Sequence, residues 1–189
     1  MFRACAVPWI ASLVSIICVM LILPGCSNQS APRSTIVVES VNNNGFLNSD
    51  VYSLGADEQM GTADDNIPEE AVPIIVRNDP QDASLNVHPN GAFSTVTIER
   101  YEVRYSGDAD LPTFSAATHL VVPTGSTVTG SLVLLPASYK IAPPLDVLVN
   151  GGEIHLNADV VLFGVEADSD TRTTTHASIS INVANWADK

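Results

Sequence analysis

The residues best suited to chemistry lie in an acidic stretch, residues 55–66, that reads Gly-Ala-Asp-Glu-Gln-Met-Gly-Thr-Ala-Asp-Asp-Asn. A calcium ion prefers about six to eight oxygen ligands, taken from carboxylates, amides and carbonyls. Asp57, Asp64, Asp65 and Asn66 supply side chains of this kind. The sequence therefore predicts a calcium ion that holds this loop together, and the alternative is a solvated acidic loop without a metal.

Calcium would also explain how so many acidic side chains tolerate one another. Nine acidic residues lie between residues 50 and 82, against one basic residue, Arg77. The Asp-x-Asp-x-Asp-Gly spacing of an EF-hand is absent. The stretch resembles a Gly-Ala-Asp…Gly-Thr-Ala-Asp-Asp segment that is common in secreted bacterial β-proteins and is often considered calcium-binding. Even then, the ion would staple the loop and would not catalyse a reaction.

Catalytic patterns are missing from the sequence. It contains no Gly-x-Ser-x-Gly, no His-Glu-x-x-His and no glycine-rich phosphate loop with its lysine. The acidic pairs Asp108/Asp110 and Asp168/Asp170 are typical of turns, so a hydrolase that uses surface acids is the least favoured class. His155 and His176 are expected about seven positions apart along the last hairpin, roughly 20 Å, which is too far for a shared zinc ion.

Residues 1–25 have the pattern of an export signal. Arg3 is their only charge, and the apolar run over residues 10–23 has roughly the length of a signal-peptide core, shorter than a membrane span of about 20 residues. Leu23-Pro24-Gly25-Cys26 follows, and it resembles the lipobox of bacterial lipoproteins. The alternatives are an uncleaved N-terminal helix and a cleaved, unlipidated secreted protein.

The lipobox resemblance implies that Cys26 becomes the first residue of the mature chain and carries acyl chains on its thiol. Several acyl chains hold a protein firmly on a membrane, because each buried methylene contributes about 0.8 kcal/mol. Ser27 and Asn28 follow the cysteine, and the absence of Asp at this place suggests the outer membrane of a Gram-negative bacterium. The predicted location is thus the cell envelope, with the membrane as one partner.

Composition narrows the function of the remaining chain. Removing residues 1–25 from 189 leaves 164, and losing Arg3 changes the formal net charge from −13 to −14. So acidic a chain argues against nucleic acid as a partner. Cys5 and Cys18 leave with the signal, so no intramolecular disulfide, zinc-thiolate site or catalytic thiol is expected.

Short β-strands alternate with turns along the mature chain. The loop over residues 46–70 shows little periodicity, and no long apolar period of 3.6 residues follows the signal. Apolar side chains change parity between Ile98 and Tyr101, which predicts a β-bulge near Glu99–Arg100. One helical turn or a short strand is expected at residues 145–149. Strands are expected over residues 35–41, 72–77, 93–106, 118–122, 127–135, 153–166 and 173–183.

These strands predict an all-β fold, an antiparallel β-sandwich of about seven or eight strands with a long acidic N-terminal loop. The closing hairpin resembles that of an immunoglobulin-like or fibronectin-type domain, although the Cys-Trp-Cys signature of true immunoglobulin domains is absent. The expected organisation is a signal peptide over 1–25, a flexible tether over 26–34 and a single domain over 35–187. Trp186 is expected to plug the open end of the core.

The predicted function is that of a non-enzymatic, lipid-anchored envelope lipoprotein acting as a binding, adhesion or structural module. Its further partner would be an envelope protein or a glycan. The alternative is a calcium-dependent carbohydrate-binding module on the same fold, which would need two or more exposed aromatic side chains on one face.

Overall fold

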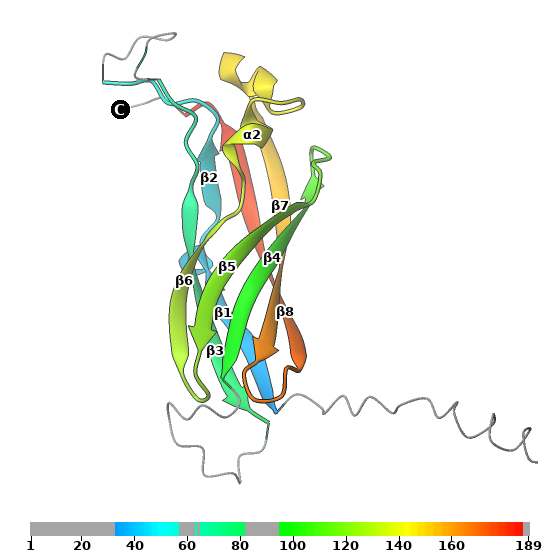
Figure 1. The fold of residues 1–189 in the computed structure, drawn as a ribbon. Coiled ribbons are helices and arrows are strands. Elements are labelled where there is room, and N and C mark those ends of the chain that lie inside the picture. Colours follow the sequence, from blue (N-terminus) through cyan, green and yellow to red (C-terminus); the bar gives the residue numbers. More distant parts are fainter. Residues whose placement is uncertain (1–32, 57–62, 64, 82–94, 187–189) are drawn as a thin grey trace, which may run out of the picture.

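The computed structural model describes residues 33–56, 63, 65–81 and 95–186. Eight strands form two sheets that face each other as a sandwich, with a short α-helix and two 3-10 helices between strands (Figure 1). The elements are β1 (Ser34–Val41), η1 (Asn42–Asn44), β2 (Leu47–Asp50), β3 (Ala71–Pro80), β4 (Val96–Gly107), β5 (Phe114–Val122), β6 (Thr127–Val133), α2 (Ala137–Lys140), η2 (Asp146–Asn150), β7 (Glu153–Glu166) and β8 (Arg172–Ala184).

One sheet has the strand order β1-β3-β6 and the other has the order β2-β8-β7-β4-β5. The first, second and fifth of the seven longer strands thus lie in one sheet, and the others lie opposite. The predicted all-β sandwich is therefore confirmed. One pair departs from the antiparallel prediction, because β2 runs parallel to β8.

The chain changes sheets between β1 and β2, through three consecutive asparagines. Asn42, Asn43 and Asn44 have φ angles of 49°, 54° and 60°. Asparagine tolerates this left-handed conformation better than most residues, because its short polar side chain can bond locally. The side-chain amide of Asn42 indeed donates to the carbonyl of Phe46 at 2.8 Å. This turn is thus a crossing from the three-stranded to the five-stranded sheet.

The β-bulge predicted in β4 is confirmed. The register of β4 against both β5 and β7 shifts between Ile98 and Arg100. The extra residue, Glu99, lets Val96 and Ile98 face the core together with Tyr101, and all three are at most 4% exposed. Glu99 and Arg100 consequently both lie on the exposed side.

The last hairpin supplies much of the core. β7 and β8 pair over their length without a register shift, and the alternation predicted for them is confirmed. The buried side chains on the inner face of this hairpin are Leu156, Ala158, Val160, Leu162, Ile179, Ile181 and Val183.

Two tyrosines of β4 link the sheets. The hydroxyl of Tyr101 donates to the carbonyl of Val133 at 3.0 Å and accepts from its backbone N–H at 3.1 Å. The hydroxyl of Tyr105 donates to the carbonyl of Leu134. Burial raises the pKa of Tyr105 far above its usual range, so this hydroxyl stays a donor. These bonds satisfy backbone groups where β6 ends.

The two ends of the sandwich carry different elements (Figure 1). We call the end that holds the start of β1 and the β7–β8 turn the Arg33 pole. We call the end that holds α2 and η2 the Lys140 pole. Within the described part of the chain, no helix is long and apolar enough to cross a membrane.

Of the two alternatives expected for residues 145–149, the helical turn is confirmed, since Asp146–Asn150 forms η2. Two other expectations need correction. The loop over residues 46–70 contains a strand, β2, which is too short and too polar to be predicted from its sequence pattern. Trp186 does not plug the core, because it is 37% exposed and lies outside the core cluster.

Deleting Glu99 tests the bulge. Without this residue, Val96, Ile98, Tyr101 and Val103 all have the same parity, so they still share the core face and β4 can pair with β5 and β7 without a register shift. The free energy of unfolding in urea should therefore change by less than about 1 kcal/mol. Deleting Glu102 instead shortens the regular part of the strand, so Tyr101 and Val103 no longer share a face, and the free energy of unfolding should fall by at least about 1.5–3 kcal/mol, the worth of one buried side chain. Equal losses in the two deletion variants would contradict the assignment of Glu99 as the extra residue of the bulge.

Candidate functional site

The acidic loop is closed at its neck by a short backbone bridge. Ser53 and Asn66 exchange two hydrogen bonds, with N···O distances of 2.9 and 3.0 Å. The carboxylate of Asp65 accepts one hydrogen bond from the hydroxyl of Tyr52 and one from the backbone N–H of Gly55, at 3.3 Å for the second. Asp65 therefore already holds the loop together as a hydrogen-bond acceptor.

Only part of the predicted calcium site can be placed. Asp65 and Asn66 lie together on the loop neck, whereas Asp57 and Asp64 lie outside the described residues. Among the residues that the structure describes, no three His, Cys, Asp or Glu side chains are grouped to hold a metal ion. Calcium binding by this loop stays a prediction.

The chemistry-bearing residue that the sequence did not reveal is Lys140. Its side chain is fully buried, with 0% of its surface exposed. Its ammonium donates to the carbonyls of Asp50, at 2.8 Å, and Pro68, and to Oε2 of Glu70 at 2.6 Å. An ammonium has three hydrogens to donate, and each has an acceptor here.

Glu70 is held from several sides as well. Its Oε1 accepts from the backbone N–H of Asp50 at 3.0 Å, and its Oε2 accepts from the hydroxyl of Ser49 at 3.1 Å. Burial lowers the pKa of Lys140, and the carboxylate of Glu70 works in the opposite direction. With every ammonium hydrogen bonded to an oxygen, the pair is built to join segments and not to act as a nucleophile.

A second buried charge lies at the Arg33 pole. Glu166 is 0% exposed. Its Oε1 accepts from the backbone N–H groups of Arg33, at 2.7 Å, and Ser34, at 3.0 Å, and from the Ser34 hydroxyl at 2.9 Å. Its Oε2 accepts from the hydroxyl of Ser169 at 2.8 Å. The Arg33 guanidinium adds an exposed bond to Asp168 at 3.1 Å, so the start of β1 is fastened to the β7–β8 turn.

The histidines that the structure describes do not converge on a site. His155 pairs with Asn182 and His176 pairs with Val161, six ladder positions away, so the predicted separation is confirmed. Nδ1 of His155 lies 2.9 Å from the side-chain oxygen of Asn182, and this hydrogen bond raises the pKa of His155. His88 lies outside the described residues.

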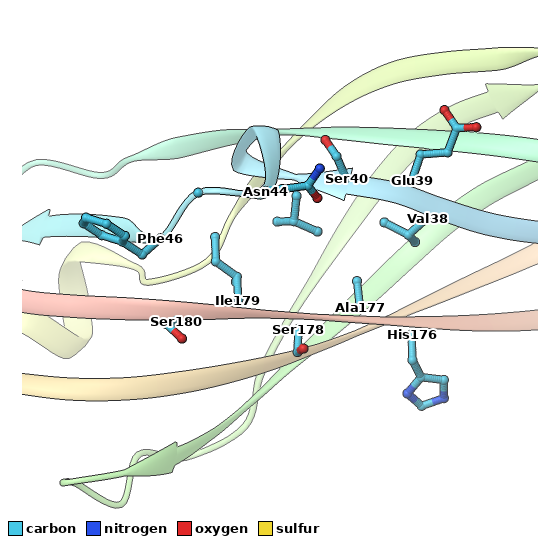
Figure 2. A pocket seen from close by; sticks show the side chains of 12 residues that line it. Val38, Glu39, Ser40, Asn44, Phe46, His176, Ala177, Ser178, Ile179 and Ser180 are labelled. Atoms are coloured by element: carbon cyan, nitrogen blue, oxygen red, sulfur yellow. The ribbon is translucent and has the colours of Figure 1, made fainter.

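A groove runs along the seam between the two sheets, where β1 passes β8 (Figure 2). Its volume is about 440 Å³. Val38 and Ala177 point toward each other across it, whereas His176 points away from it. Phe46, at its far end, is 60% exposed. The walls of the groove thus combine the backbone of two strands with both apolar side chains and polar ones, among them Glu39, Ser40 and Asn44.

Compared with known protein families and with curated proteins, the chain matches none. The site must therefore be judged from its own geometry.

Glu70→Ala tests the role of the Lys140 pair. Removing the carboxylate leaves a buried ammonium without its counter-charge, so we expect the free energy of unfolding to fall by about 3 kcal/mol. Glu69→Ala is the matched control, because the neighbouring carboxylate is exposed, and it should change stability by less than about 0.5 kcal/mol. Urea denaturation measures both, and equal losses would refute the proposed role of Glu70.

Proposed function

We propose that this protein is a non-enzymatic, lipid-anchored lipoprotein of the cell envelope whose sandwich acts as a binding, adhesion or structural module. The observation that carries the proposal is the fastening of Arg33 and Ser34 by the buried Glu166. If acyl groups on Cys26 hold the chain on a membrane, any force between the membrane and the domain acts on the start of β1. The bonds to Glu166 would pass that pull into the last hairpin instead of peeling β1 away.

The shape of the domain supports the same proposal. β7 has 14 residues, so the two poles are separated by about 45 Å at a rise of about 3.3 Å per residue. An anchor at the Arg33 pole would present the Lys140 pole away from the membrane. Ile141 and Val147, each 61% exposed, lie at this outer end. The proposed location is the outer membrane of a Gram-negative bacterium, as Ser27 and Asn28 after the cysteine suggest.

The absence of an enzyme role is part of the proposal. In the part of the chain that the structure describes, the two buried charged side chains, Lys140 and Glu166, are occupied by hydrogen bonds that join chain segments. The proposed partner, besides the membrane, is an envelope protein or a glycan. Nucleic acid is disfavoured by the formal net charge of −13.

Intact-mass spectrometry of the exported protein tests the anchor. We expect the N-terminal residue to be Cys26 carrying diacylglycerol and a further acyl chain, and the protein to fractionate with membranes. Cys26→Ser removes the only acceptor thiol of the lipobox and should abolish both the added mass and the membrane association. An unmodified Cys26 thiol, or a chain that still begins at Met1, would end the lipoprotein proposal.

Calcium is tested separately, by thermal melting. If Asp57, Asp64, Asp65 and Asn66 hold an ion, saturation should raise the melting temperature by about 3 °C over the EDTA-treated protein, because binding to the folded state alone adds stability. Asp57→Asn/Asp64→Asn should remove this difference while Tyr52 still bonds to Asp65. A melting temperature that EDTA leaves unchanged would remove calcium from the proposal.

A further inference from the structure

Half of β8 has an open edge. Strand β2 covers β8 on its outer side at Ile181–Ala184 only. On the other side, β7 pairs with β8 from Arg172 to Ala184. Among the described residues, no strand pairs with the outer edge of β8 between Arg172 and Ser180.

The direction of the backbone groups on this edge follows from two hydrogen bonds. The carbonyl of Ala184 accepts from Val51, next to β2, so it faces the outer edge. The carbonyl of Thr171 accepts from Glu166, so it faces β7. Because successive residues of a strand direct their backbone groups to opposite sides, the even-numbered residues of β8 face the open edge. The N–H and C=O groups of His176 and Ser178 and the N–H of Ser180 therefore point outward without a strand to receive them, whereas the parallel pairing of Leu47 with Ile181 directs the Leu47 N–H to the carbonyl of Ser180.

Sheet edges usually carry devices that prevent pairing, such as bulges, prolines or inward charges. β1 and the β4–β5 pair each contain a register shift. β8 pairs with β7 without one. Its open stretch reads Arg-Thr-Thr-Thr-His-Ala-Ser-Ile-Ser, with no proline and with Arg172 as its one permanent charge. This edge is regular and left unprotected.

The open edge lies inside the groove beside β1, and this position decides what can bind there (Figure 2). Val38, Ala177 and Ile179 give the groove an apolar floor, while His176, Ser178 and Ser180 direct their side chains outward. β1 forms the opposite wall. A single extended segment fits in continuation of β2, whereas a strand that already belongs to a sheet would bring its next neighbour against β1.

We infer that this groove binds an extended peptide segment of a protein partner, added as a strand to β8. The segment would alternate small apolar side chains, placed on Val38 and Ala177, with polar or basic side chains facing solvent. Main-chain hydrogen bonds supply affinity in this mode, and alternate side chains supply specificity. Basic residues are favoured because the chain carries a formal net charge of −13 and because Asp159 lies beside His176.

This inference names the partner of the proposed binding module and thus rests on that function, but it does not depend on the lipid anchor. The probe is a fluorescent nine-residue peptide in which valine alternates with lysine and threonine. We expect saturable binding to the full chain by fluorescence anisotropy. A peptide of the same composition with its valines grouped together has the same charge without the alternation, and it should bind at least about tenfold more weakly.

Ser178→Pro is the decisive variant. Proline removes the outward N–H of residue 178, and the bonds of β8 to β7, which use odd-numbered residues, remain. We expect binding to weaken about tenfold. Ser178→Ala keeps the N–H and should bind like the unmodified protein. Equal binding by the two variants, or equal binding of both peptides, overturns the inference.

Hydrogen exchange gives a measurement that needs no variant. Peptide addition should slow exchange at the amides of His176, Ser178 and Ser180, and unchanged exchange there refutes strand addition. Sedimentation reveals the competing occupant, since a dimer that Ser178→Pro dissociates would show that a second copy covers the edge. The mass of the Cys26 residue reports the anchor independently, so failure of peptide binding and failure of the lipoprotein proposal are told apart.

Discussion

Three chain segments meet at one buried ammonium. Lys140 enters from α2, and its acceptors are Asp50 at the end of β2, Pro68 in the acidic loop and Glu70 just before β3. Burying a charge is costly unless it is paired and fully hydrogen-bonded, so a conformation that breaks any one of these contacts is strongly disfavoured. The end of β2, residues 68–70 and α2 are thereby fixed relative to one another. The place where the loop ends is thus determined just before β3 begins.

The Arg33 pole uses the same device with the opposite charge. Glu166 is a buried carboxylate whose donors include two successive backbone N–H groups, at Arg33 and Ser34. Residues 27–189 contain no cysteine, so no disulfide can close either end of the sandwich. Apolar burial holds the two sheets face to face, but it is non-directional and does not fix where a strand starts. Directional bonds to one buried charge at each pole supply that information.

The parts of the fold that were predictable are those with repeated local patterns. β7 follows from the apolar residues at every second position from Ile154 to Leu162, and the bulge at Glu99 follows from a parity change within one strand. β2 was not predictable, because Leu47–Asp50 is short and polar and its partner, β8, lies more than 130 residues away in the sequence. Lys140 was missed because its burial depends on carbonyls that no sequence pattern reveals. Its one signal was a lysine just before Ile141 and Ala142, in a chain with only two lysines.

The groove is a consequence of where the chain changes sheets. β1 belongs to the three-stranded sheet until Val41, and the asparagine turn then delivers β2 to the other sheet. Because β2 is four residues long and begins opposite Ile181, it cannot cover the first half of β8. An earlier turn would have closed the edge, and a chain that never switched would have left all of β8 open. The left-handed geometry of Asn42–Asn44 therefore sets both the length of the exposed edge and the wall that stands beside it.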